Sequence, residues 1–254
     1  MLELNYLHII SAIFVGIASG YLGSFMILKR MALVGDALSH VALPGLALAL
    51  LFNVNPFLGA FATLFVGIII IWLIENKTEL PVESLVGLLF TFSLAIGVLI
   101  TPDEHIFEAL FGDIAQITAL DTVVAVILSL VVILVMKKIS KSFILTTMSP
   151  DLAKSSGVNV RRNNLFFLLM VALIVALGIK AVGTLLMGAL VIIPAIASKN
   201  FSSSMSRYVV TSSVIGLASL LGGVILAGFY NFPPGPLVVL ASTAIFLLSL
   251  LKKA

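Results

Sequence analysis

Asp36 and His40 lie four residues apart in KRMALVGDALSHVALPGLALAL (residues 29–50), a stretch that is otherwise mostly apolar. On a helix this spacing places both side chains on one face. A carboxylate and an imidazole within apolar sequence are costly unless they pair or face a polar path. They are also ligands that divalent first-row metals accept. The pattern is equally compatible with a metal or proton path and with a helix-capping aspartate beside a buried, hydrogen-bonded histidine.

The composition shows what kind of element must position this pair. Hydrophobic residues make up 61% of the chain and charged residues 10%, and the mean hydropathy is +1.27. A soluble chain of 254 residues needs more charge to cover its surface, so a polytopic membrane protein is predicted. The chain has no cysteine, which excludes disulfides and thiolate ligands. The net charge of +3 comes from loop lysines and arginines and does not indicate nucleic-acid binding.

Nine apolar runs of membrane-spanning character are present, separated by short polar segments. They are Tyr6–Leu28, Leu33–Phe52, Pro56–Ile74, Ser84–Ile100, Leu120–Met136, Leu165–Ile179, Val182–Ser198, Tyr208–Phe229 and Leu237–Leu251. The runs are too long and too unalternating for a β-barrel. We therefore predict one all-α transmembrane domain over residues 1–254, with eight or nine transmembrane helices.

The basic residues predict the orientation of the chain in a cell (inner) membrane. With the N-terminus outside and nine crossings, the inner loops and the C-terminus hold 13 of the 14 lysines and arginines, leaving Lys180 outside. This excess is what the positive-inside rule expects of a cytoplasmic face. The C-terminus is then cytoplasmic, and Lys180 is expected to extend to the outer interface.

Three further stretches interrupt the apolar pattern. Glu83 follows Pro81 in a predicted first helical turn, where a carboxylate either stabilises the helix or belongs to a transport path. His105 is expected to be a solvated loop residue. Small residues at helical spacing, among them Gly16, Gly20 and Gly188, are expected to permit close helix packing.

A proline-broken stretch on the predicted cytoplasmic side is either a partner-docking segment or an ordinary polar loop. Its candidate residues, within residues 192–207, are Pro194, Ser198, Lys199 and Arg207. The chain has no GxxxxGK[ST] phosphate loop and no HExxH motif. We therefore expect that it is not an enzyme and that any ATP hydrolysis is done by a separate subunit.

The block GDALSHVALPG resembles the zinc/manganese importer permeases, the membrane subunits of ATP-binding-cassette uptake systems for divalent metals. The similarity continues in order through LFGDI, MSPDLAKSSGV, KAVGTLLMGALVIIPAIAS and NFPPGPLVVL. One departure is Glu83, where the family pattern has an aspartate. The family is similar in organisation to the permeases of cobalamin and siderophore importers.

The resemblance implies a homodimer that works with cytoplasmic ATP-binding subunits and an extracellular or periplasmic metal-binding protein. It places Asp36 and His40 in the path of transported Zn²⁺ or Mn²⁺, with no permanently bound cofactor. It places the coupling segment at Pro194–Ser206. The alternative is a stand-alone ion-coupled carrier or channel, in which the same pair relays protons or cations; an intramembrane metalloenzyme is a weaker third interpretation.

Overall fold

The computed structural model of the chain describes residues 5–52, 54–78, 80–100 and 117–252. Over these ranges it is helical and contains no strand, which confirms the all-α prediction. The helices are α1 (Tyr6–Leu28), α2 (Val34–Val41), α3 (Leu43–Leu51), α4 (Pro56–Lys77), α5 (Val82–Ile100), α7 (Ala119–Met148), α8 (Pro150–Ser155), α9 (Val160–Val182), α10 (Met187–Lys199), α11 (Met205–Tyr230) and α12 (Pro234–Leu250). The prediction for His105 falls outside the described residues.

The apolar helices follow the nine predicted runs. Among the described residues, seven helical segments are long and apolar enough to cross a membrane, with α2 and α3 together forming one of them. The two remaining runs form the shorter apolar helices α10 and α12. The polytopic membrane architecture is therefore confirmed.

Several helix bounds differ from the predicted runs, and two of the differences have a clear physical reason. Helix α7 continues past Met136 to Met148, which makes it 30 residues, or about 45 Å, long. It ends where Ser149 is extended, as expected for the residue before a proline. Helix α10 begins at Met187 instead of Val182, because Gly183 ends α9 with a φ of +86°.

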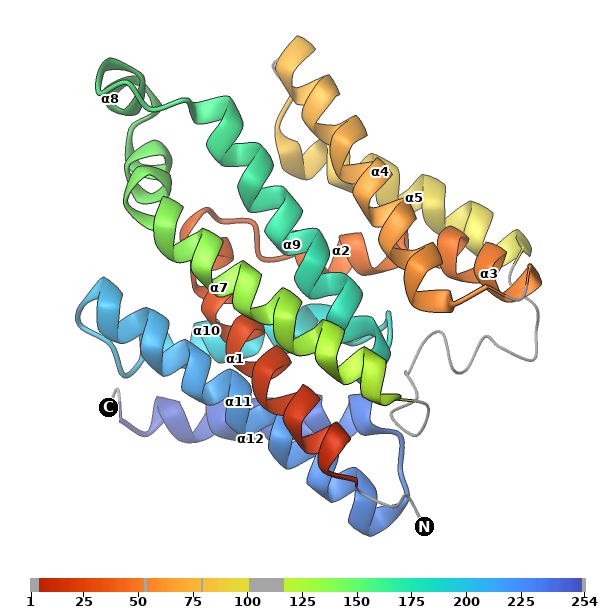
Figure 1. Cartoon of the computed structure of the whole chain (residues 1–254). Helices are drawn as coiled ribbons and strands as arrows, with labels where there is room; N and C mark the ends of the chain where they lie inside the picture. Colours follow the sequence, from red (N-terminus) through yellow and green to blue (C-terminus); the bar gives the residue numbers. More distant parts are fainter. Residues whose placement is uncertain (1–4, 53, 79, 101–116, 253–254) are drawn as a thin grey trace.

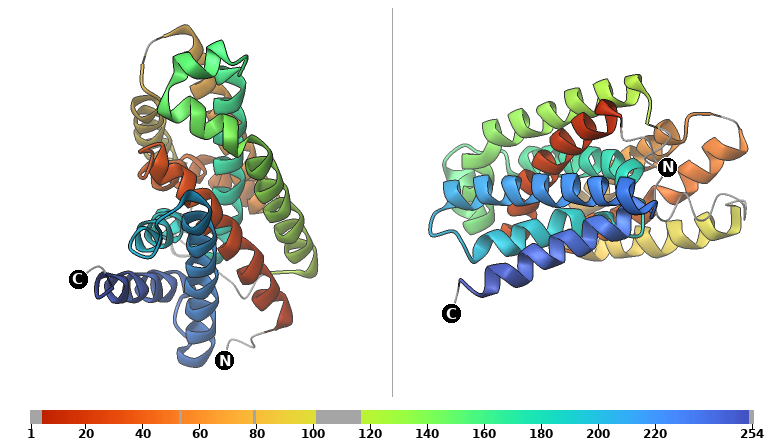
Figure 2. Two further views of the ribbon diagram at one scale, coloured as in Figure 1. Left: turned by 90° about the vertical axis from the view of Figure 1, so that its left-hand side faces the viewer. Right: turned by 90° about the horizontal axis from the view of Figure 1, so that it is seen from below.

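The helices form one bundle in which α9 lies between α7 and α4 (Figure 1). Helix α1 packs against α7 and α11, and the short helix α2 contacts α4, α5, α9 and α10. Helix α1 begins and helix α12 ends at opposite ends of the bundle (Figure 2). We call the end at which α1, α4 and α7 terminate and α9 begins the basic end, because Lys29, Lys77, Lys154 and Arg161 meet there.

Helices α1 and α11 approach each other closely, as predicted for Gly20. A Cβ at Gly20 would collide with the backbone of Ser212. The Ser212 hydroxyl donates a hydrogen bond to the Gly20 carbonyl over 2.6 Å. Small residues thus allow backbone contact where lipid supplies no hydrophobic driving force for helix association.

Candidate metal path and its surroundings

The candidate site lies on α2, a short helix that forms the first half of a membrane span. Pro44 begins the second half as one of the first residues of α3. Because proline has no N–H, it removes the donor that would otherwise serve the carbonyl of His40, four residues earlier. Pro44 thus helps to end α2 directly after His40.

Asp36 and His40 both lie within this enclosed helix. His40 is 9% exposed, and its ring meets the ring of Phe90 on α5 edge-on at a centroid distance of 5.2 Å. Asp36 is partly exposed and lies in the first turn of α2. Their spacing places both groups on one helical face.

Neither side chain shows the bonding expected of a purely structural pair. Within the described part of the chain, His40 Nδ1 is buried without a hydrogen-bond partner. Helix α2 has no side-chain hydrogen bond at its N-cap, which is Leu33. A buried imidazole nitrogen without a partner is costly. Within the described residues, Asp36 therefore does not cap α2 through its side chain, and His40 is not a fully hydrogen-bonded core histidine.

Two neighbours hold the backbone and carboxylate of Asp36 in place. The Ser39 hydroxyl lies 2.6 Å from the Asp36 carbonyl and 2.6 Å from the Thr184 carbonyl. Gly188 on α10 lies directly against Asp36: a Cβ there would be 2.5 Å from Asp36 Cβ and 2.8 Å from Oδ1. The sequence gives no signal for Ser39, and for Gly188 it predicts close helix packing alone. The structure shows that Gly188 packs against the side chain of Asp36.

One copy of the chain supplies few metal ligands. Over the described ranges, no group of three or more His, Cys, Asp or Glu side chains is close enough to hold a metal ion. A metal site that used Asp36 and His40 would therefore need further ligands, from a second copy, main-chain oxygens or water.

The other predicted site residues lie apart from this pair. Glu83 is exposed in the first turn of α5, and its charge acts on Lys29 at the basic end. Pro194 and Ser198 are buried in α10, so neither presents a surface to a soluble partner. Lys199 and Arg207 are exposed on either side of the turn between α10 and α11.

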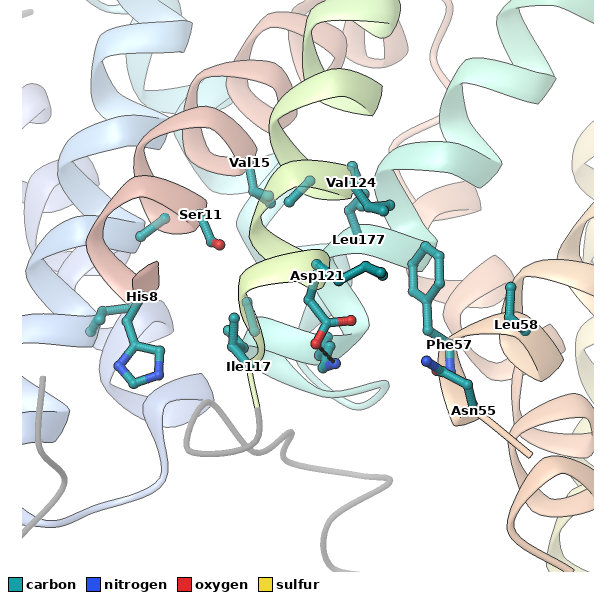
Figure 3. A pocket seen from close by; sticks show the side chains of 16 residues that line it. His8, Ser11, Val15, Asn55, Phe57, Leu58, Ile117, Asp121, Val124 and Leu177 are labelled. Atoms are coloured by element: carbon teal, nitrogen blue, oxygen red, sulfur yellow. Dashed lines mark hydrogen bonds and ion pairs between the residues drawn. The ribbon is translucent and has the colours of Figure 1, made fainter. Parts of the chain in front are cut away.

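Lys180 and Asp121 close the opposite end of the bundle. Their ion pair, at 2.5 Å, borders a cavity of about 240 Å³ between α1, α4, α7, α9 and α11 (Figure 3). His8 lines the same cavity from α1, and most of the other lining side chains are apolar. Lys180 thus pairs with a carboxylate instead of extending freely to the interface.

A buried network that the sequence did not reveal lies at the basic end. Lys29 donates a hydrogen bond to Asn164 Oδ1, and Asn164 Nδ2 lies 2.6 Å from both carboxylate oxygens of Glu75. The Lys29 amine also lies 5.7 Å and 5.3 Å from the ring centroids of Phe143 and Phe167. Burial lowers the pKa of Lys29 to about 8, although Glu75 and Glu83 favour the charged form.

We expect the apparent melting temperature of the wild-type protein to rise, relative to that of Lys29→Met, between pH 8 and pH 10. In this window an unfolded lysine is still protonated, whereas the folded Lys29 has lost its proton. The unfolded state then binds more protons, so stability increases with pH. Melting in detergent at several pH values measures the difference. Lys138→Met, at an exposed lysine of α7, is the control, and an equal pH dependence for both variants would contradict the assignment.

Comparison with known proteins agrees with this architecture. The family model described as "ABC 3 transport family" matches residues 1–253. The high-affinity zinc uptake system membrane protein ZnuB of Haemophilus influenzae is 32% identical over 259 residues, covering 100% of this chain and 99% of that protein. The manganese import system permease protein ScaB of Streptococcus gordonii is 31% identical over 245 residues, covering 95% of this chain and 88% of that protein.

Two solved structures share the fold. PsaBC from Streptococcus pneumoniae, in complex with Fab, gives a TM-score of 0.84 at 27% identity and covers 97% of this chain and 91% of that one. An inward-facing metal-chelate type ABC transporter gives a TM-score of 0.75 at 19% identity over 96% of this chain and 85% of that one, a likeness of fold alone. The resemblance seen in GDALSHVALPG is confirmed along the whole chain. The chain belongs to the ABC 3 transport family.

Proposed function

We propose that the chain is the membrane-spanning permease subunit of an ATP-driven importer for zinc or manganese ions. The observation that carries the proposal is the buried His40 Nδ1 without a partner, one helical turn from Asp36. The relatives named for zinc uptake and manganese import support this substrate class. ATP hydrolysis belongs to separate cytoplasmic subunits, and an external metal-binding protein delivers the ion.

A homodimer completes the metal path. Each copy contributes one carboxylate and one imidazole, so two copies facing a shared axis offer up to four ligands. Charged oxygen and neutral nitrogen ligands offset part of the cost of removing water from a divalent ion. A transit site must also release its ion, which favours incomplete and transient coordination during alternating access. Because zinc and manganese both accept these ligands, selectivity depends on geometry and on the delivery protein.

The test is metal uptake by proteoliposomes that hold the permease, its ATPase and the metal-binding protein. We expect uptake of radiolabelled zinc or manganese that requires all three components and ATP. The stand-alone carrier or channel predicts uptake by the permease alone, driven by an ion gradient. Uptake that is independent of ATP and of the ATPase would exclude the proposed function.

The proposed orientation places the N-terminus outside and the basic end in the cytoplasm. Its support is the collection of basic side chains at one end of the bundle and the opposite positions of the start of α1 and the end of α12. A tag at the N-terminus should be accessible from outside the cell, and a tag after Lys252 only from inside. Access to both tags from the same side would contradict an odd number of crossings.

We expect that reversing Lys199 and Arg207 to Glu weakens association with the ATPase about tenfold, because charge complementarity at such a contact is lost. Both side chains are exposed next to the α10–α11 turn. Pro194 and Ser198 are buried in α10, so they can affect docking only through the conformation of this turn. Co-purification and ATPase stimulation measure the effect, with the exposed Lys138→Glu as control. Helix α8 is the competing contact: weakening by Lys154→Glu, with none by the Lys199 and Arg207 reversals, would place docking there.

A further inference from the structure

The basic end contains a cavity that neither Asp36 nor His40 lines. It has a volume of about 570 Å³ and lies where α4 and α7 end, beside α8 and the start of α9. Four basic side chains line it: Lys29, Lys77, Lys154 and Arg161. The volume lies within the range of small-molecule sites.

The charges that line this cavity do not cancel. Among the described residues that line it, Glu75 is the one carboxylate, and both of its oxygens already accept hydrogen bonds from Asn164 next to Lys29. Lys154 has a partner in Asp151, at 3.8 Å, but both side chains are well exposed, and such pairs contribute little. Among the described residues, neither Lys77 nor Arg161 forms an ion pair. The described lining residues carry four positive charges and one negative charge, so a surplus of two positive charges remains even when Glu83, whose charge acts on Lys29, is counted.

The face of α4 that carries Lys77, a lining residue of the cavity, continues into exposed apolar side chains. Leu73 and Ile70, one to two turns before Lys77, are 46% and 39% exposed. Trp72, between them in the sequence, donates a hydrogen bond from Nε1 to the Arg161 carbonyl over 3.2 Å. Tryptophan is enriched where a membrane meets water. Positive charge above an apolar, tryptophan-bearing surface matches the headgroup and acyl chain of an anionic lipid.

We propose that this cavity binds a phosphate group, carried by an anionic phospholipid or free in solution. Lys77 and Arg161 contact the phosphate oxygens from α4 and α9, and Lys29 lies deeper, held by Asn164. Binding there ties the end of α4 to the start of α9. The exposed apolar side chains Ile70 and Leu73 of α4 favour the lipid as the source of the phosphate.

The test measures lipid binding to the purified, delipidated permease–ATPase complex by native mass spectrometry. Phosphatidylglycerol and phosphatidylcholine with identical acyl chains are compared, and inorganic phosphate is added as a competitor. The site variant combines Lys77→Gln with Arg161→Gln. The control combines Lys138→Gln with Arg162→Gln, which removes the same charge from exposed residues that do not line the cavity.

We expect phosphatidylglycerol to bind more tightly than phosphatidylcholine, and the site variant to weaken it about 25-fold, since each basic side chain at an anionic lipid surface contributes about fivefold. The control should stay within about twofold of the wild type. Displacement by millimolar inorganic phosphate would support the same site with soluble phosphate as its ligand, and resistance would support the lipid. Equal binding of the two lipids, equal effects of the two variants, or binding only in the absence of the ATPase would overturn the proposal.

Discussion

Asp36→Asn is expected to reduce ATP-dependent metal uptake about 100-fold or more while the complex still assembles and hydrolyses ATP. Asparagine keeps the size and hydrogen-bonding capacity of the side chain but removes the negative charge that attracts a divalent ion. Changes to groups that only support a metal ligand already cost 10–100-fold. If Asp36 only stabilised the first turn of α2, asparagine would serve nearly as well.

His40→Leu should have an effect of similar size. Leucine removes the imidazole nitrogen that lacks a hydrogen-bond partner, and it suits the apolar contact with Phe90. A structural role would therefore leave this variant active. The double variant should be little worse than either single one, because groups that act as a unit are strongly non-additive.

The measurement is uptake per assembled complex, with expression level and ATPase rate as controls. Wild-type uptake by both Asp36→Asn and His40→Leu would reject these residues as the metal path.

The span positions could be predicted from the sequence because hydrophobic runs reflect the bilayer thickness directly. The bounds that failed depend on local backbone geometry. Gly183 ends α9 in a positive-φ conformation, and α7 continues as a helix beyond its apolar part, up to Ser149. A hydropathy profile does not predict where the backbone adopts a positive φ, as at Gly183. It also does not predict that a helix such as α7 continues beyond its apolar segment.

The candidate pair could be recognised from the sequence because its four-residue spacing is local. Its surroundings could not, since they depend on contacts between distant segments. Ser39 meets the Thr184 carbonyl across 145 residues. Lys29 meets Asn164 across 135 residues, and Asn164 meets Glu75 across 89. Nothing in the type of these residues distinguishes them from ordinary loop and helix-end residues.

Gly188→Ala is expected to reduce metal uptake about tenfold or more, because the added methyl group displaces Asp36. The Cβ would lie 2.5 Å from Asp36 Cβ, closer than real contacts permit, and 3.0 Å from its Cα, which is tighter than most contacts. The backbone of α2 or α10 must therefore move. Overpacking of this kind typically costs about 1–3 kcal/mol of stability, so part of the protein should still fold and assemble.

Gly222→Ala separates the effect on the path from a general effect of alanine in a helix. Gly222 lies within α11, and a Cβ there meets nothing within 4 Å. This variant should transport like the wild type and be as stable or slightly more so, since alanine favours helix by about 1 kcal/mol over glycine. Uptake per folded complex is compared with melting temperature for both variants. If Gly188→Ala lowers uptake only in proportion to the amount of folded complex, Gly188 serves packing alone. A loss of uptake well beyond that of folded protein means that the position of Asp36 itself limits metal passage.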